Sequence, residues 1–274
     1  MMTKAFVTGW PVSHSKSPLL HGYWIKEHEI DGSYEPVAVE PESFKTFINE
    51  LQNSKFVGGN VTMPHKEAAF EYTEKTGSAA NKLGAVNTLW FENGKLNGDN
   101  TDAYGFSANL DDYHSEWRDM KQALVLGAGG ASRAVIYSLI EAGFDQVHIV
   151  NRTVERAQSL VERFGDKTSA HSFNDAKFLM TQTNLLVNTT SIGMDGSQSS
   201  ALPNLEGLPD HALVTDIVYT PLQTPLLEAA AHRGLRTIDG LGMLLHQAVP
   251  GFEKWFGVRP KVTGALRNYI LEQS

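Results

Sequence analysis

The chain has 274 residues and no cysteine, and its 23 basic and 31 acidic side chains give a formal net charge of -8 at pH 7. The length exceeds the usual size of one hydrophobic core and predicts two domains, while the lack of cysteine excludes disulfides, thiolate zinc sites and thiol catalysis. The acidic balance without basic clusters argues against a nucleic-acid partner, and with no signal peptide and no stretch of roughly 20 apolar residues we expect a cytoplasmic protein without membrane contact.

Short strands alternate with amphipathic helices over the first hundred residues, which is typical of a mostly parallel sheet in an α/β domain. Apolar runs predict strands at residues 5–7, 37–39, 56–63 and 84–91. Apolar positions at helical spacing predict helices after Ser17 and at residues 43–51, 66–72 and 78–83. Asn93 and Gly94 predict a turn into the next short strand.

The serine-rich loop at residues 13–18 precedes the first helix. Ser17 followed by Pro18 predicts an N-cap and first-turn pair. The same loop suits a carboxylate, because free amides, hydroxyls and the helix dipole favour an anion there. His14, His21 and His28 recur every seventh residue without a close zinc spacing, so we expect no metal site.

The segment at residues 57–66 delivers several polar side chains at the end of an apolar strand. Asn60 and Thr62 point the same way on a period of two, and Pro64 ends the strand and suits the first turn of a helix. This places Lys66 in the first helical turn, where the helix dipole disfavours a cation. Lys66 is therefore either solvated or held there for chemistry.

Polar residues before the fifth expected helix have both a structural and a functional interpretation. Asn87 is an amide in an apolar strand, and a buried amide must find partners, either in the protein or in a ligand. Asp99 and Asp102 precede the helix that carries Phe106 and Leu110, and helix capping is the common use of such an aspartate.

A second unit begins near Gln122 with an apolar strand at residues 123–126. The glycine turn at residues 127–132, a helix at 134–142 and a strand at 146–150 follow in the order of a dinucleotide-binding half. The sixth position of the G-x-G-x-x-G pattern is Ser132, yet the flanking elements favour nucleotide binding over a plain tight turn.

The residues after that strand discriminate between cofactors. An NAD enzyme usually has an acid there, whereas this chain has Asn151, Arg152 and Arg156, which suit a phosphate on the ribose and therefore NADP. Solvated arginines on a helix surface are the alternative.

The rest of the chain completes the second unit and returns to the first. We expect strands at residues 185–188, 213–217 and 235–238 and helices at 224–232, 243–256 and 262–273. The loop at residues 193–200 either covers a ligand or is a plain connector. Tyr219 and Gln247 are compatible with local backbone hydrogen bonds.

The combined motifs resemble the shikimate dehydrogenase family over nearly the whole chain. The resemblance rests on residues 13–18, 59–66, 84–88, 98–102, 127–131, 151–153 and 240–247. It implies two α/β domains separated by a cleft, a mostly parallel substrate and catalytic domain at residues 1–102 and a Rossmann-type NADP domain at 103–239, with C-terminal helices at 240–274 returning to the first. Ser78 departs from the pattern, because some members carry an acid there.

The resemblance also implies roles for single residues. Lys66 and Asp102 would be the catalytic pair. The residues implied for shikimate are Ser15, Ser17, Asn60, Thr62, Asn87, Tyr219 and Gln247. Those implied for NADP are Gly127, Ala128, Gly129, Gly130, Ala131, Asn151, Arg152, Thr153, Arg156, Ile217 and Gly240.

The reaction implied by the resemblance is NADP-dependent reduction of 3-dehydroshikimate to shikimate in aromatic amino-acid biosynthesis. Hydride transfer to a ketone creates an alkoxide that needs a proton, and a lysine paired with an aspartate can supply it. Two alternatives stay open, a quinate/shikimate dehydrogenase that uses NAD or NADP and a nucleotide-binding regulatory module without turnover. A monomer and a homodimer are equally compatible with the sequence.

Overall fold

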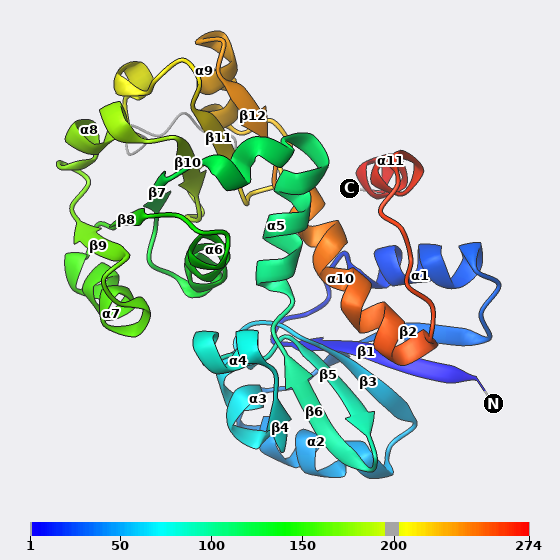
Figure 1. The fold of residues 1–274 in the computed structure, drawn as a ribbon. Helices are drawn as coiled ribbons and strands as arrows, with labels where there is room; N and C mark the ends of the chain where they lie inside the picture. Colours follow the sequence, from blue (N-terminus) through cyan, green and yellow to red (C-terminus); the bar gives the residue numbers. More distant parts are fainter. Residues whose placement is uncertain (1, 195–202, 274) are drawn as a thin grey trace. The chain divides into compact units, whose positions relative to one another are not determined.

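The computed structural model describes residues 2–194 and 203–273. The chain divides into two compact units, of which the first comprises Met1–Asp102 with Leu245–Ser274 and the second Ala103–Leu244 (Figure 1). The second unit continues to Leu244, past the boundary at residue 239 expected from the sequence. Of the expected loop at residues 193–200, residues 195–200 lie outside the described part.

The first unit is built on a six-stranded sheet with the order β2-β1-β3-β5-β6-β4. Its strands are β1 (Thr3–Gly9), β2 (Gly32–Ala38), β3 (Phe56–Val61), β4 (Lys75–Thr76), β5 (Thr88–Glu92) and β6 (Lys95–Asp99). β1 pairs in parallel with β2 and β3, and β4 with β6, whereas β5 runs antiparallel to β3 and β6. The sheet is therefore mostly parallel, as predicted, and Asn93 and Gly94 form the β5–β6 turn with positive φ angles.

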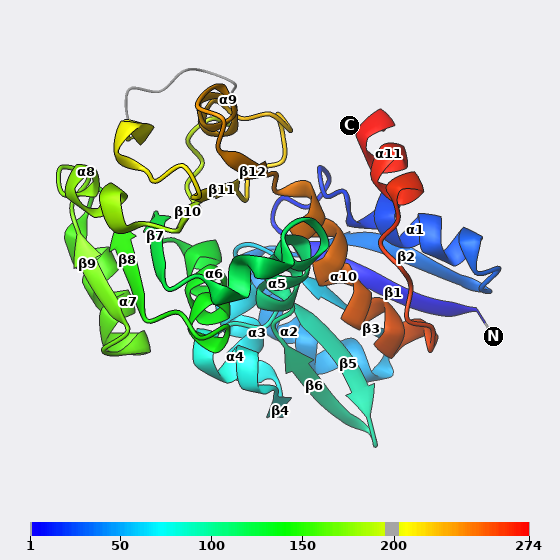
Figure 2. The same ribbon diagram turned by 45° about the horizontal axis from the view of Figure 1, so that its top comes forward.

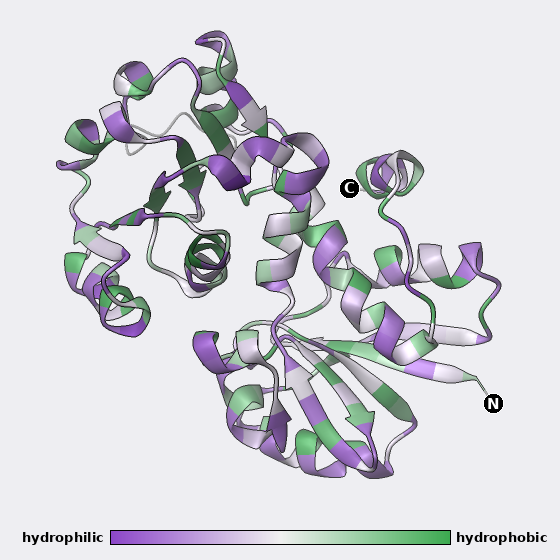
Figure 3. Ribbon diagram, in the orientation of Figure 1, coloured by the Kyte–Doolittle hydropathy of each residue, from purple (hydrophilic) through white to green (hydrophobic). Residues whose placement is uncertain are grey.

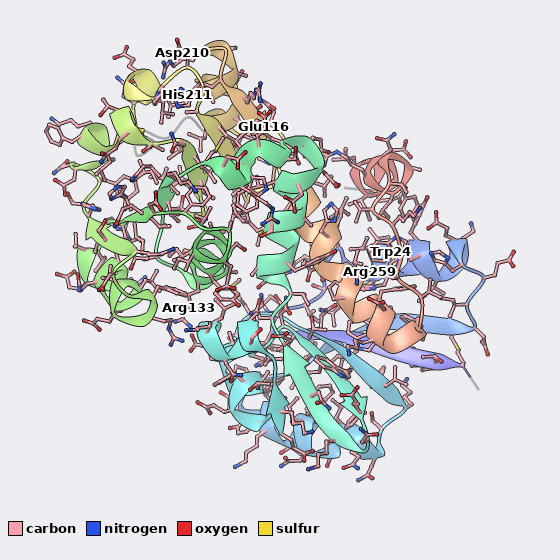
Figure 4. The ribbon with its side chains drawn as sticks, in the orientation of Figure 1. Trp24, Glu116, Arg133, Asp210, His211 and Arg259 are labelled. Carbon is pink, nitrogen blue, oxygen red and sulfur yellow. The ribbon has the colours of Figure 1, made fainter. Side chains whose placement is uncertain are left out.

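Helices cover both faces of this sheet, because β1 is apolar on both sides. Phe6 packs with α2 (Phe44–Glu50), α3 (Lys66–Tyr72) and α4 (Ser78–Leu83). Ala5 and Val7 point to the opposite face, toward α1 (Ser17–Glu27) and α10 (Leu241–Phe256). Trp24 of α1 donates its indole N–H to Lys261 O at 3.2 Å, which ties the segment before α11 (Gly264–Glu272) to α1 (Figure 4).

The second unit contains a fully parallel six-stranded sheet with the order β12-β11-β10-β7-β8-β9. Its strands are β7 (Gln122–Leu126), β8 (Gln146–Val150), β9 (Thr168–His171), β10 (Leu185–Asn188), β11 (Leu213–Asp216) and β12 (Arg236–Ile238). When the strands of this unit are numbered 1 to 6 in chain order, the sheet order is 3-2-1-4-5-6. This is the order of the Rossmann fold, and it confirms the predicted α/β class. The inner strands β7, β8, β10 and β11 are almost fully buried and contribute apolar side chains to both faces of the sheet, and Figure 3 shows their hydrophobic character.

Helices lie on both faces of this second sheet (Figure 2), and each face is covered by an apolar core. One core holds α5 (Asp102–Tyr113), α6 (Gly130–Glu141) and α7 (Val154–Phe164), and the other holds α8 (Ala176–Leu179) and α9 (Pro225–His232). The direction of the sheet order reverses between β7 and β10, and ligands of such sheets bind at the carboxyl ends of the strands at this point. No helix among the described residues is long and apolar enough to span a membrane.

Several expected element boundaries were wrong for local reasons. α1 begins at Ser17 with Lys16 as its N-cap, and no side chain caps it. β5 begins at Thr88 because Gly84 ends α4 in the left-handed conformation and residues 85–87 cross over to the strand, so Asn87 lies just before β5. Asp99 serves a different helix from the one expected, since its Oδ1 accepts from Ala80 N in the first turn of α4 at 2.9 Å.

Candidate active site

The first unit brings together a lysine and an aspartate that lie 36 positions apart in the sequence. Lys66 is the first residue of α3 and Asp102 the first residue of α5. Lys66 Nζ donates to Asp102 Oδ2 at 2.6 Å, and the two side chains are 28% and 17% exposed. The ion pair is half-buried yet open to a small molecule, and it places an ammonium and a carboxylate where a proton can be exchanged with a bound ligand.

Asn87 fixes the orientation of this carboxylate. Its Nδ2 donates to Asp102 Oδ1 at 2.7 Å, and its Oδ1 accepts from Thr101 N at 2.9 Å. The hydroxyls of Thr88 and Thr101 donate to the same Oδ1 at 2.8 and 3.1 Å. Because a carboxylate only accepts and a backbone N–H only donates, the amide has one possible orientation, which leaves one Nδ2 hydrogen without a partner among the described residues.

The loop before α5 holds Asp102 in place through its own side chains. Asp102 N donates to Asn100 Oδ1 at 3.0 Å, and Asn100 Nδ2 donates to Ala85 O at 3.1 Å. Asp99 Oδ1 accepts from Asn100 N at 2.8 Å. These hydrogen bonds connect the loop to the segment that carries Asn87, so the Asp102 carboxylate and the Asn87 amide are held in a fixed arrangement.

Asn60 extends the same network into the sheet. It is the last residue but one of β3, lies opposite Thr88 of β5 and is 5% exposed. Its Nδ2 donates to Asn87 O at 3.0 Å and to Thr88 Oγ1 at 3.2 Å. Its Oδ1 accepts from the hydroxyl of Tyr34 in β2 at 2.6 Å. Sequence reasoning missed Tyr34, although a buried tyrosine usually finds a hydrogen-bond partner and this rule was the available signal.

The remaining expected substrate residues of the first unit follow the ends of its parallel strands or lie on its helices. Ser15 and Ser17 belong to the segment after β1, where Ser17 N donates to Ser15 Oγ at 3.3 Å. Thr62 follows β3, and a Cβ at Gly9 would lie 2.4 Å from Thr62 Cγ2, so only glycine lets these two strand ends approach so closely. Gln247 is buried on α10.

Tyr219 lies in the second unit, after β11, where burial raises the pKa of its phenol. Ser78 is the first residue of α4.

The glycine turn of the second unit leads from β7 into the 12-residue helix α6. Gly127 has φ +106°, and a Cβ there would lie 2.8 Å from Thr189 Oγ1. A Cβ at Gly129 or Gly130 would meet no atom within 4 Å, so open space faces the helix N-terminus. Backbone amides, the helix dipole and this space together fit the pyrophosphate of a dinucleotide.

A pocket of about 710 Å³ lies at the carboxyl ends of β8, β9 and β10. It is lined by Asn151, Arg152, Thr153, Arg156, residues 172–174, residues 190–192 and Pro203. Asn151 Nδ2 donates to Thr153 O at 2.8 Å and shapes the loop before α7. Both arginines are exposed, and neither has an ion-pair partner in the part of the chain that is described, so both guanidinium groups can bind an anion.

Ile217 and Gly240 lie side by side, since a Cβ at Gly240 would be 2.4 Å from Ile217 O. Arg133, which the sequence analysis did not single out, projects from the first turns of α6 (Figure 4). A second hollow, of about 550 Å³, contains Glu116, Asp210 and His211 at the amino ends of the strands (Figure 4). It lies at the opposite edge of the sheet from the glycine turn, where parallel sheets do not normally bind dinucleotides.

Comparisons with known proteins match most of the chain. Residues 7–89 match the family model "Shikimate dehydrogenase substrate binding domain", residues 112–217 match "Shikimate / quinate 5-dehydrogenase" and residues 240–265 match "Shikimate 5'-dehydrogenase C-terminal domain". A shikimate dehydrogenase (NADP(+)) of Mesorhizobium japonicum is 58% identical over 98% of this chain and 95% of its own length. One from Brucella abortus is 56% identical over 98% and 93%.

Solved structures give the same result. Shikimate 5-dehydrogenase of Thermus thermophilus, in complex with NADP(H) and shikimate, is 36% identical with a TM-score of 0.87 and covers 100% of both chains. Quinate dehydrogenase of Corynebacterium glutamicum, in complex with NAD, is 26% identical with a TM-score of 0.90 and covers 99% of both chains.

Proposed function

This chain belongs to the shikimate dehydrogenase family, and we therefore propose that it catalyses the reversible, NADP-dependent reduction of 3-dehydroshikimate to shikimate in aromatic amino-acid biosynthesis. The single observation that carries the proposal is the Lys66–Asp102 ion pair, 2.6 Å long and oriented by Asn87. NADPH, when bound, supplies a hydride to the carbonyl carbon, and negative charge then develops on the carbonyl oxygen.

The Lys66–Asp102 pair handles the proton in this proposal. In reduction it gives a proton to the developing alkoxide, and in oxidation it removes one from the alcohol. Lys66 also stabilises negative charge on the reacting oxygen, and the free N–H of Asn87 adds a second donor beside it. The two groups lie 2.6 Å apart, so we assign the proton transfer to the pair and not to one residue alone.

Substrate binding is assigned to hydroxyls and amides that suit a carboxylated polyol. We propose residues 1–102 and 240–274 as the substrate and catalytic domain. Ser15 and Ser17, at the N-terminus of the 11-residue helix α1, suit the carboxylate because hydroxyls and the helix dipole favour an anion. The other proposed substrate contacts are Asn60, Thr62, Asn87, Tyr219 and Gln247.

Residues 103–239 are proposed as the NADP domain. The open space at Gly129 and Gly130 supports a pyrophosphate site on α6, with Ala128, Ala131, Ile217 and Gly240 as the further proposed contacts. Arg152 and Arg156 line one pocket without ion-pair partners among the described residues, which supports a 2'-phosphate there and NADP over NAD.

One assay tests the function and its competitors. Purified protein is mixed with shikimate or quinate and with NADP or NAD, and the absorbance of the reduced nicotinamide is followed. We expect turnover with shikimate and NADP, and much less with quinate or NAD. Equal rates with quinate or with NAD would favour a quinate/shikimate dehydrogenase, and no turnover with any pair would favour a binding module without catalysis.

We further propose that the enzyme works in the cytoplasm, where NADPH is available, as a monomer or homodimer. Fractionation of the source cells tests the location. Light scattering on the purified protein gives the mass in solution, and a value above two chains would contradict the assembly proposed.

A further inference from the structure

Tyr34 reaches the proposed substrate site from two strands away. In the parallel register, Tyr34 of β2 lies opposite Ala5 of β1, and Asn60 of β3 lies opposite Val7. The small side chain at residue 5 lets the phenol cross β1, and its hydroxyl meets Asn60 Oδ1 at 2.6 Å. Tyr34 and Asn60 are 8% and 5% exposed, so this hydrogen bond is shielded from water.

Two neighbouring rings hold the phenol in place. His21 stacks on Tyr34 with centroids 4.0 Å apart and planes 18° apart, and Trp255 lies 5.8 Å away. Neither ring nitrogen of His21 has a hydrogen-bond partner among the described residues. The stack therefore constrains the position of the ring while the hydroxyl alone makes the polar contact.

The orientation of the Asn60 amide follows from its neighbours. Its Nδ2 faces Asn87 O, which can only accept, and Thr88 Oγ1, whose proton goes to Asn87 Oδ1. A reversed amide would place two oxygens in contact, so Oδ1 must face Tyr34 and the phenol must donate. Burial raises the pKa of Tyr34 well above its usual value, against smaller opposite effects of Ser17 and Asn60, so the phenol keeps its proton.

These constraints give two neighbouring amides opposite polarity. Both N–H groups of Asn60 are used inside the protein, and its Oδ1 retains one lone pair, so Asn60 can only accept from a ligand. Asn87 has its oxygen filled by three donors and one N–H left, so it can only donate. Asn60 therefore suits a ligand hydroxyl, and Asn87 suits the oxygen that lies beside Lys66 and Asp102.

We propose that Tyr34 is a positioning residue that fixes Asn60 as the acceptor for one ring hydroxyl of the substrate, and thereby contributes to selectivity for a polyol. This inference rests on the proposed function. Removal of the phenol oxygen leaves the ring in its stack, but Oδ1 loses its fixed donor, and the amide is free to turn away from the substrate hydroxyl.

Tyr34→Phe, compared with Tyr23→Phe, tests the inference. Tyr23 contacts the ring of Tyr269 at 5.2 Å on the same unit and loses the same single oxygen. With saturating NADP we expect Tyr34→Phe to raise the KM for shikimate about 5- to 50-fold, as the loss of one buried hydrogen bond implies, with kcat within about threefold of wild type. Tyr23→Phe should change neither constant.

A double-mutant cycle tests whether Tyr34 acts through Asn60. On an Asn60→Ala background, Tyr34→Phe should add less than about twofold to KM, because the group it positions is gone. Shikimate analogues that each lack one ring hydroxyl give a second readout. Wild type should discriminate against one analogue, and Tyr34→Phe should lose that discrimination while it keeps the others.

The outcomes separate this inference from the function on which it rests. If wild type oxidises shikimate and Tyr34→Phe has unchanged KM, additive effects with Asn60→Ala, or an equal loss for every analogue, Tyr34 has no positioning role and the inference alone fails. If wild type oxidises no shikimate, the proposed function fails and the inference fails with it.

Discussion

Replacement of Lys66 by methionine is the most direct test of the catalytic pair. Methionine keeps most of the length of the side chain and removes the ammonium that lies 2.6 Å from Asp102. A positioned acid or base contributes about 10² to 10⁴ in rate, which corresponds to about 3 to 5.5 kcal/mol of barrier. We therefore expect kcat for shikimate oxidation to decrease by a factor of about 10² to 10⁴.

The structure also gives the expected effect of Lys66→Met on stability. Asp102 is 17% exposed and keeps its bond from Asn87 at 2.7 Å, so the remaining carboxylate is partly solvated and has a donor. We expect the free energy of unfolding to decrease by about 1 to 2 kcal/mol, between the values for exposed and buried ion pairs. Ordinary domains have total stabilities of about 5 to 15 kcal/mol. The variant should therefore remain folded.

The assay combines turnover with thermal unfolding followed by circular dichroism. Lys95→Met is the control, because Lys95 is an exposed lysine at the start of β6 and should leave both quantities unchanged. A Lys66→Met protein that turns over at the wild-type rate would remove this residue from the mechanism. A protein that is inactive because it is unfolded would show that the stability argument is wrong.

Three further predictions concern the cofactor site and the core. Arg152→Ala should raise the KM for NADP about 10- to 100-fold, as the loss of a charged hydrogen bond implies, and leave the KM for NAD unaffected. The control is Arg163→Ala, on the helix that follows Arg152 and outside the pocket, and equal losses for both cofactors would contradict the phosphate contact. Gly129→Ala should weaken NADP binding in calorimetry and leave the melting temperature unchanged, because the added Cβ meets no protein atom. Gly127→Ala should also lower the melting temperature, because Gly127 has φ +106°. Similar melting temperatures for the two variants would refute the predicted difference in stability. Burial lowers the pKa of His21 from 6.5 to about 3, which the nearby Asn60 only partly offsets, so the unfolded chain binds more protons between these values and stability is lost as the pH falls below about 6.5. Urea unfolding should show about 2 kcal/mol of such loss at pH 5 that disappears in His21→Phe and persists in His28→Gln.

The parts of the fold that were predictable from sequence depend on local patterns. The strand, glycine turn and helix from Gln122 to Glu141 follow from an apolar run, a position that only glycine adopts easily and a helical period. The Asn93–Gly94 turn is equally local. The predicted start of β5 was wrong, because an apolar run alone does not show that Gly84 ends a helix and that residues 85–87 cross over to the strand.

The site was less predictable, because its contacts depend on strand register. No spacing in the sequence shows that Lys66 meets Asp102; the pairing was expected only from the family resemblance, and the geometry brings the two together. Tyr34 was missed because its partner is set by the order β2-β1-β3 and by a small residue on β1, neither of which a single strand reveals. The expected cap at Ser17 was wrong, and its backbone N–H bonds to Ser15 instead.

The position of Lys66 shows how the two kinds of information combine. A cation in the first turn of α3 works against the helix dipole, at a cost of about 0.3 to 1 kcal/mol, while Asp102 at the start of α5 is favoured by the same effect. Local energetics alone would therefore place an acid at residue 66, and two carboxylates would then face each other beside Asn87. Such a pair would repel and could not donate a proton to an alkoxide at neutral pH unless one carboxyl stayed protonated. The unfavourable lysine and the favourable aspartate form one unit, and the sequence breaks the local rule at the residue on which the proposed proton transfer depends.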